Sequence, residues 1–285
     1  MRLLADHCDL YNAALAERRE AWRMCQISVS YGDQSAQLKE IRAADPYGQG
    51  RHSFTAQQQT LRRLNFVFAA YFRRVRGTDK GWRHARRGRN PQQRSVGYPR
   101  FKPYQRFDQV LFIAGDGAKW EPADDHWAYA TFQAVGRVKV KQHRAVVGRV
   151  KTLQLKRQGR RWYVVVVAET EAVALPPTGR SVGVDVGVAR FLTTSDGEVV
   201  VNLRFLNSAQ ERIADLQRRK QRARPGSGNR RRIRRALAKE WRKLRNQRRE
   251  FHHKTARRLV DSCDTLALED LQVANMTAAA SGTAA

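Results

Sequence analysis

The hydrophobic period changes twice along the chain, and this change restricts the fold more than any other sequence feature. In residues 1–76, apolar side chains recur every three or four positions, as at Leu61, Leu64 and Phe68, which is typical of amphipathic helices. In residues 108–175 the period shortens to two, which is typical of strands. The last third holds short strands, a long basic helical stretch and one more strand. The sequence therefore predicts a multidomain α+β protein.

We expect three regions. Residues 1–76 should form a helical lobe. Residues 77–176 should form a linker rich in Gly, Pro and Arg, followed by a small antiparallel β-barrel with one basic face. Val146, Val147 and the apolar run at 162–167 are expected to lie in its strands, the latter run as a buried strand. The third region, 177–285, begins at a pair of prolines and mixes strands with helices.

The third region has a recognisable order of elements. Three strands are expected first, around 181–187, 191–194 and 199–201, with a Ser-Asp-Gly hairpin signal at 195–197. A basic helical hairpin over 208–262 follows, and a fourth strand begins at Thr265. Three strands, helices and a strand are the opening order of an RNase H-like fold, so we expect an incomplete domain of that kind.

Charge narrows the choice of partner. The chain has 55 Lys and Arg against 26 Asp and Glu, a formal net charge of +29, which indicates a polyanionic partner. No apolar run of about 18 residues predicts a membrane-spanning helix, and the start does not resemble a signal peptide. The three cysteines form no CxxC pair, which argues against a disulfide framework and a cysteine zinc site within this chain. We therefore expect a cytoplasmic, nucleoid-associated protein that binds nucleic acid.

The strongest basic signal lies in residues 218–258, which hold 19 Lys and Arg but only two acids. A charge run is usually a solvated helix face, but this one lacks the interspersed Glu of a salt-bridged helix. We therefore predict phosphate-backbone contacts. His252 and His253 are interpreted as part of this basic surface and not as metal ligands. The predicted contact residues here are Arg218, Arg219, Lys220, Arg230, Arg231, Arg232, Arg234, Arg235, Arg242, Lys243, Arg245, Arg248 and Arg249. Trp241, Leu244, Phe251 and Leu259 are expected to form the apolar stripe of the same helix pair.

A second basic segment precedes the predicted barrel. Its arginines are followed by Arg100 and Lys102, which stand between Tyr98, Phe101 and Tyr104 and near two prolines that favour extended backbone. Basic residues interleaved with aromatic ones suit backbone contacts and base stacking, so Arg100 and Lys102 are further candidates. The alternative is a plain solvated linker. The arginines that lead into this segment are Arg83, Arg86, Arg87, Arg89 and Arg94.

Two carboxylates are candidates for chemistry. Asp185 is expected at a strand centre between two valines and two glycines, where a charge must be paired or bound to a metal. Glu269 and Asp270 end the fourth strand and face opposite sides of it, and we prefer Glu269 as the partner of Asp185. Hydrolysis of phosphodiesters by two metals needs such carboxylates. Actin-like ATPases and sugar kinases carry a similar strand aspartate, so Asp185 alone does not decide the function.

Together these motifs resemble the TnpB (OrfB) family, proteins of bacterial insertion sequences that are often named transposases and are related to type V CRISPR effectors. The resemblance covers nearly the whole chain. It implies an RNA-guided DNA endonuclease with a helical recognition lobe, a wedge-like β-barrel and a RuvC-type nuclease domain. The motifs are GYPRFK at 97–102, VGVDVG at 182–187, SDG at 195–197, the arginine-rich helices, and LEDL at 268–271 followed by Asn275 and Met276.

The resemblance also assigns roles. Asp185 and Glu269 correspond to the first and second catalytic carboxylates and would bind Mg²⁺. Guide RNA and double-stranded DNA would be the partners, with base pairing reading the sequence and the protein reading backbone shape and a short flanking motif. The oligomeric state is not indicated.

Two departures from the family pattern affect the expected function. No zinc ribbon and no third catalytic aspartate follow LEDL, and the basic opening strand of the family does not precede Leu3, so the chain is expected to be truncated at both ends. Our first hypothesis is a TnpB-like protein, derived from a guided nuclease, that binds RNA and DNA but whose cleavage is impaired. The alternatives are a Mg²⁺-dependent endonuclease completed by another chain, and a non-catalytic basic protein that packages or regulates nucleic acid.

Overall fold

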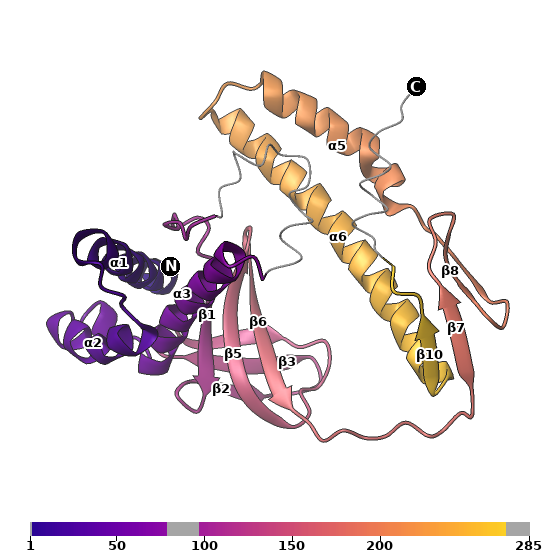
Figure 1. Cartoon of the computed structure of the whole chain (residues 1–285), viewed down its shortest axis with the longest axis horizontal. Helices are drawn as coiled ribbons and strands as arrows, with labels where there is room; N and C mark the ends of the chain where they lie inside the picture. Colours follow the sequence, from indigo (N-terminus) through magenta and orange to yellow (C-terminus); the bar gives the residue numbers. More distant parts are fainter. Residues whose placement is uncertain (1, 79–96, 272–285) are drawn as a thin grey trace. The chain divides into compact units, whose positions relative to one another are not determined.

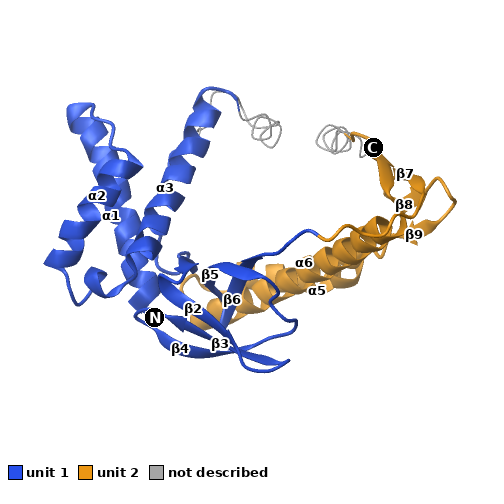
Figure 2. Cartoon of the chain, turned by 90° about the horizontal axis from the view of Figure 1, so that it is seen from below, with its two compact units in different colours: residues 1–172, 274–285 blue, residues 173–273 orange. Residues whose placement is uncertain are grey.

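The computed structural model describes residues 2–78 and 97–271, and it has the mixed α+β architecture that the sequence predicts (Figure 1). The described residues up to 172 form one compact unit, unit 1, and residues 173–271 form unit 2 (Figure 2). The predicted arginine cluster of 83–94 and the motif residues Asn275 and Met276 lie outside the described residues.

Unit 1 begins with helices, as predicted. They are α1 (Arg2–Cys25), α2 (Tyr31–Ala44), the short 3₁₀ helix η1 (Gln49–Arg51) and α3 (Phe54–Val75). Ser30 and Ser53 cap α2 and α3 by accepting a hydrogen bond from a backbone N–H of the first turn. Leu61, Leu64 and Phe68 are buried as expected.

The second half of unit 1 is a curled six-stranded sheet in the order β4-β3-β2-β1-β5-β6. All neighbours are antiparallel except β1 and β2, which pair in parallel over two residues at a sharp bend. Among the described residues β4 and β6 remain edges, so the predicted small antiparallel β-barrel is an open half-barrel. The strands are β1 (Gln109–Ala114), β2 (Gly117–Pro122), β3 (Trp127–Phe132), β4 (Gly136–Lys141), β5 (Arg149–Gln158) and β6 (Arg161–Glu169).

One local strand prediction was wrong, and a second was right in position but wrong in burial. Val146 and Val147 lie in the connection between β4 and β5, and not in a strand. The apolar run at 162–167 does form β6, but Val165 and Val167 are 40% and 54% exposed. Because β6 is an edge strand with one covered face, only alternate residues pack inward.

The bend between β1 and β2 fixes the helices against the sheet. Gly117 has a φ of 77°, and a Cβ there would lie 2.3 Å from the Cβ of Ser53, the residue that caps α3. Only glycine fits this backbone conformation and this close approach. The hydroxyl of Ser53 also donates to the carbonyl of Asp116 across 3.4 Å. The start of α3 is therefore held directly on the sheet.

Helices and sheet of unit 1 share a single hydrophobic core. It includes Leu15 of α1, Leu64 of α3, and Phe112 and Phe132 of the sheet, whose ring centroids are 5.1 Å apart. Leu153 of β5 is fully buried in the same cluster. Buried apolar side chains of the helical lobe and of the half-barrel thus form one cluster in the part of the chain that the structure describes.

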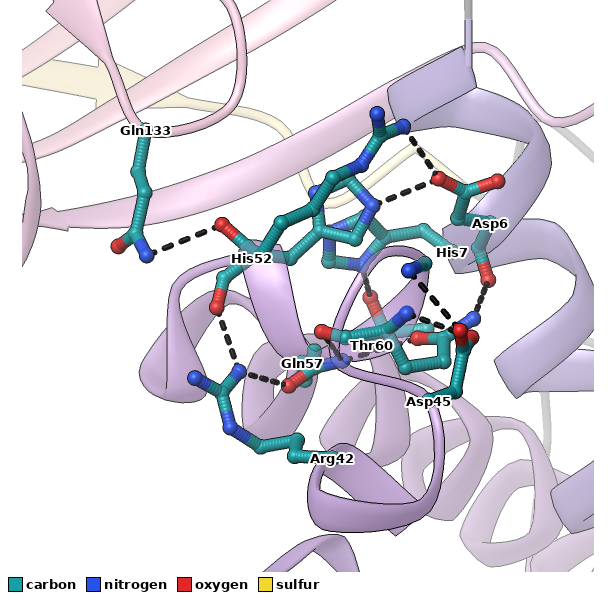
Figure 3. A network of polar contacts seen from close by, with 11 residues as sticks. Asp6, His7, Arg42, Asp45, His52, Gln57, Thr60 and Gln133 are labelled. Atoms are coloured by element: carbon teal, nitrogen blue, oxygen red, sulfur yellow. Dashed lines mark hydrogen bonds and ion pairs between the residues drawn. The ribbon is translucent and has the colours of Figure 1, made fainter.

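A buried polar network lies beneath this core (Figure 3). His52 and Asp6 are joined by a hydrogen bond of 2.7 Å between Nε2 and Oδ2, and Arg51 forms an ion pair of 2.7 Å with the same oxygen. His7 shares a hydrogen bond of 2.8 Å with Thr60 of α3, and its ring lies 5.2 Å from that of His52. The network connects α1, η1 and α3, and burial lowers the pKa of His7 to about 3.

Unit 2 contains a four-stranded sheet in the order β10-β7-β8-β9. Its strands are β7 (Ser181–Asp185), β8 (Arg190–Thr194), β9 (Val199–Val201) and β10 (Thr265–Leu268). β8 is antiparallel to both of its neighbours, whereas β10 runs parallel to β7. The predicted order of three strands, two helices and a strand is confirmed.

One face of this sheet is covered by the end of a long helix. Helices α5 (Phe205–Arg222) and α6 (Gly228–Ser262) separate β9 from β10, and Leu259 near the end of α6 packs on Val182, Val184 and Leu192. Asp264 then accepts hydrogen bonds from the backbone N–H groups of Thr178 and Gly179, both at 2.8 Å. This contact joins the segment before β7 to the segment before β10, so the two strands start side by side.

No helix among residues 2–78 and 97–271 is long and apolar enough to cross a membrane.

Candidate active site and nucleic-acid interface

Asp185 and Glu269 lie on the same open depression of unit 2. β7 and β10 are parallel neighbours whose last paired residues are Val184 and Leu268, and each carboxylate is the next residue of its strand's chain. In such a pair, residues at equivalent positions point to the same face of the sheet. The depression has a volume of about 570 Å³, and both carboxylates line it, together with Gly183, Thr193 and Ser195. Asp270 is not among its lining residues.

The environment of Asp185 differs from the sequence expectation. Asp185 is the last residue of β7 and is exposed, because the chain leaves the sheet at the following valine and turns at Gly187, whose N–H donates to the carbonyl of Phe191. An exposed carboxylate needs no partner, so the expectation of a buried charge at a strand centre is corrected. Its exposure instead makes it accessible to a ligand.

The floor of the depression is built by a side-chain contact that sequence reasoning did not identify. The backbone N–H of Gly183 donates to the hydroxyl of Ser195 across 3.1 Å, and the N–H of Ser195 donates back to the Gly183 carbonyl across 2.8 Å. A Cβ at Gly183 would lie 3.6 Å from that of Ser195, which is ordinary contact, so the glycine leaves the floor low but is not sterically required. The position of Ser195 in the hairpin signal was the available clue.

The donor set of this site suits a hard divalent cation. Asp185 and Glu269 offer carboxylate oxygens, and Mg²⁺ commonly binds through one or two carboxylates while keeping several waters. Among residues 2–78 and 97–271, no group of three or more His, Cys, Asp or Glu side chains lies close enough to hold a metal. The described site therefore offers two ligands.

The arginine-rich helices expose most of their cations. α5 and α6 pack through Ile213, Leu216 and Ile233, which are buried, and the opposite faces carry the charge. Several of these arginines form no ion pair with a carboxylate in the part of the chain that the structure describes: Arg218, Arg232, Arg234, Arg235, Arg245 and Arg248. They are therefore available to phosphate groups.

A few predicted contact residues have local partners instead. Arg219 pairs with Asp215 across 3.5 Å, and Arg230 and Arg231 donate to carbonyls of the turn between the helices. Arg249 donates to His253 across 3.3 Å. Lys220, Arg230 and Arg242 are half-buried, whereas Lys243, Arg249 and most of the others are exposed.

The predicted apolar stripe of α6 needs one correction. Leu244 and Leu259 are buried and Phe251 packs on Phe191 with ring centroids 4.7 Å apart, but Trp241 is 41% exposed. Ile233, which sequence reasoning did not include, is buried in its place. Ile233 and Leu244 are eleven residues apart, a spacing that returns to the same face after three helical turns and could have revealed it.

Arg100 and Lys102 of unit 1 differ in accessibility. Arg100 is exposed. Lys102 lies with its Nζ 4.5 Å from the ring centroid of Tyr11, and its backbone exchanges hydrogen bonds of 2.9 Å with the side chain of Asn12. Burial lowers the pKa of Lys102 to about 8. The extended GYPRFK segment thus packs on α1, and Lys102 contributes to that packing.

Two of the three aromatic residues of this segment make contacts with other residues of unit 1. Tyr98 packs edge-on against Phe68 and Tyr71, at centroid distances of 5.8 and 5.2 Å. The hydroxyl of Tyr104 donates to Asp9 across 2.6 Å. Phe101 remains 49% exposed.

Unit 1 carries a further basic surface, on the sheet for which the sequence predicts one basic face. On the outer face of the half-barrel, the guanidinium of Arg137 lies 3.6 Å from the ring centroid of Tyr129, and Nζ of Lys139 lies 4.3 Å from that of Trp127. The period-two alternation of basic residues in β4 was the signal, but the cross-strand partners depend on register.

This chain is similar to a transposase family model and to two proteins named as RNA-guided DNA endonucleases. Residues 164–280 match a family model described as "Probable transposase" of the OrfB_IS605 type. A protein of Streptomyces pristinaespiralis named "Putative RNA-guided DNA endonuclease" is 30% identical over 279 residues, which cover 94% of this chain and 61% of that protein. The Escherichia coli K12 protein named "Putative RNA-guided DNA endonuclease InsQ" is 26% identical over 286 residues, which cover 99% of this chain and 65% of that protein. The chain therefore spans less than two thirds of the length of these two relatives.

Proposed function

We infer that this chain belongs to the TnpB/OrfB family of insertion-sequence proteins, and we propose that it binds RNA and DNA as a protein derived from an RNA-guided DNA endonuclease. The observation that carries the proposal is the basic helix pair α5–α6, whose exposed arginines include several with no carboxylate partner among the described residues. Arginine in this setting binds phosphates without reading sequence.

We further propose that unit 2 is part of a RuvC-type nuclease domain. The parallel pairing of β10 with β7 beside two antiparallel strands is the arrangement expected for the first four strands of an RNase H-like fold. The convergence of Asp185 and Glu269 on one depression supports the same proposal. Bound Mg²⁺ would activate a water molecule and neutralise charge on the scissile phosphate. Asp185 and Glu269 would hold the ion, and the low floor at Gly183 would admit the phosphate backbone.

The described site offers two carboxylates, and two carboxylates bind a metal ion weakly. We therefore propose that this chain alone binds nucleic acid but cleaves it poorly. An active endonuclease completed by another polypeptide is the second candidate, favoured by the exposure of Asp185 and Glu269 on the open face. In that case, addition of the polypeptide that completes the site should produce Mg²⁺-dependent cutting that Asp185→Asn abolishes. Absence of cutting under those conditions would leave binding as the function.

The binding proposal is tested by salt-dependent affinity for a DNA duplex and for a structured RNA. The triple variant Arg234→Gln, Arg235→Gln, Arg245→Gln should lower the slope of log affinity against log salt by up to about 3, since each lost phosphate contact removes about one unit. A charge-matched control, Lys39→Gln, Arg144→Gln, Arg160→Gln, removes three exposed cations of unit 1. Equal slopes for the two triple variants would overturn the assignment to α5–α6.

The RNA that co-purifies with the protein tests whether the chain derives from an RNA-guided nuclease. RNA is extracted from the purified chain and separated by size. One species of defined length supports descent from an RNA-guided nuclease, and a heterogeneous mixture supports the alternative of a basic packaging protein.

A further inference from the structure

The helix pair of unit 2 contains a groove that the proposed phosphate contacts do not explain. α5 lies along the N-terminal part of α6 (Figure 1), and a hollow of about 390 Å³ opens between them. Helices that pack closely fill such a space with apolar side chains. Here the facing positions are mostly charged or polar, so the hollow stays open. We call it the interhelix groove; its lining includes Arg212, Leu216, Arg232, Ile233, Ala236, Lys239 and Glu240.

The floor and the rim of the interhelix groove have different chemistry. Leu216 and Ile233 are buried and Ala236 is half-buried, so the floor is apolar. Such a floor suits the flat face of a nucleobase, which packs well against apolar side chains. The volume is within the range of sites that hold small organic groups.

The rim offers both signs of charge. The side chain of Glu240 is only 11% exposed and pairs with Arg212 across 3.4 Å, so a carboxylate acceptor is held low in the groove. Arg232 and Lys239 form no ion pair with a carboxylate in the described ranges. An acceptor near the floor and free cations at the rim match a nucleotide, whose base carries donors and whose phosphate is anionic.

We propose that the interhelix groove binds one unpaired nucleotide of a nucleic-acid strand, with the base on the Leu216, Ile233 and Ala236 floor and the phosphate at Arg232 and Lys239. The inference rests on the proposed nucleic-acid binding and adds a site to it. A base within a duplex is stacked and paired and cannot enter a groove of this kind. The helix pair therefore prefers single-stranded segments to duplex at this position.

The test fills the groove without changing its charge. Ala236→Phe places a ring over the floor, and Ala238→Phe, two residues on, adds the same group at an exposed position outside the groove. Fluorescence anisotropy then measures the affinity of wild type and both variants for a labelled oligo(dT) strand and for a labelled duplex of equal length. Circular dichroism verifies that each variant is folded, and Ala236→Leu replaces Ala236→Phe if the larger ring prevents folding.

The outcomes separate the two proposals. Ala236→Phe should weaken single-strand binding roughly 5-fold or more, the effect of losing one base contact, and leave duplex binding within two-fold of wild type, on the order of experimental scatter. Ala238→Phe should change neither. If both variants affect single strand and duplex alike, or if Ala236→Phe has no effect, the groove site is refuted while nucleic-acid binding stands. If wild type binds neither probe, the proposed function itself fails, and the groove site with it.

Discussion

Unit 1 and unit 2 combine the same elements, helices and a curled sheet, but they bury very different cores. In unit 1, three helices and six strands contribute to one cluster that includes Leu15, Phe112 and Leu153. In unit 2, the clustered core among the described residues is limited to Val182, Val184, Leu192, Leu259 and Cys263. Because apolar burial is the main stabilising term in folding, the comparison indicates a stable unit 1 and a marginal unit 2.

The two units also differ in where they place their polar side chains. In unit 1 the helices pack on the sheet, and polar side chains such as Asp6, His7 and His52 form hydrogen bonds with one another and with other residues of the unit. Unit 2 covers only the face beneath α6 and leaves Asp185 and Glu269 on the other face. Residues that must meet a ligand cannot also be buried in a core, so the unit with the smaller core carries the candidate chemistry.

The largest effect is expected from matched core truncations. Leu153→Ala in unit 1 and Leu192→Ala in unit 2 remove the same atoms from positions that are 0% and 3% exposed. Each should cost about 2–5 kcal/mol, with Leu153→Ala at the upper end because its dense surroundings cannot collapse into the cavity. Equilibrium urea unfolding measures both. A larger loss of unfolding free energy for Leu192→Ala than for Leu153→Ala would contradict the expectation that the core of unit 1 is the more densely packed one.

Limited proteolysis compares the units in one sample. Brief trypsin digestion should cut first within 173–271, where the core is small and basic residues are dense, and should leave a fragment containing the half-barrel. Mass spectrometry identifies the fragments. A protected 173–271 segment alongside a degraded half-barrel would contradict the expected order of stability.

Acid should destabilise the two units at different pH. Burial lowers the pKa of His7 from 6.5 to about 3, so folding favours the neutral ring; the stability this provides is complete above about pH 6.5 and falls as the pH drops toward 3. The N–H groups of Thr178 and Gly179 lower the pKa of Asp264, so its contribution is present above the ordinary value of 3.8 and is lost only below it.

Thermal unfolding at pH 7, 5.5 and 4.5 tests this contrast. The ring of His7 faces Thr60, His52 and Asp6. His7→Phe removes this titrating group and should therefore reduce the loss of stability of unit 1 in acid. Asp264→Asn should leave the response of unit 1 unchanged and weaken unit 2 at neutral pH. If His7→Phe retains the full loss of stability between pH 6.5 and 4.5, the titration of His7, shown in Figure 3, is not its source.

The smallest effect on stability is expected at the candidate site. Asp185 is exposed, so Asp185→Asn should change the free energy of unfolding by no more than about 0.5 kcal/mol. The same measurement on Asp264→Asn serves as a contrast, because that carboxylate accepts backbone hydrogen bonds. A large cost for Asp185→Asn would mean that its carboxylate supports the fold instead of facing a ligand.

Much of the organisation was readable from the sequence because it depends on local periodicity. The helices of the first 75 residues, the strand order of the last third and the position of the basic helix pair all follow from apolar spacing and turn residues. Predictions failed where packing decided the outcome. Trp241 is exposed although its spacing suits a stripe, and Val146 and Val147 lie in a connection although they are good strand residues.

The sequence by itself determined which residue types are present and in what local structure: a basic helix pair, a strand that carries Asp185, and a later strand with Glu269 at its end. Only the tertiary structure decided which of them meet. The parallel register of β7 and β10 brings two carboxylates 84 positions apart (269 − 185) onto one depression, and the packing of α5 on α6 leaves the interhelix groove open. Such long-range contacts depend on sheet register and helix packing, which local spacing does not encode.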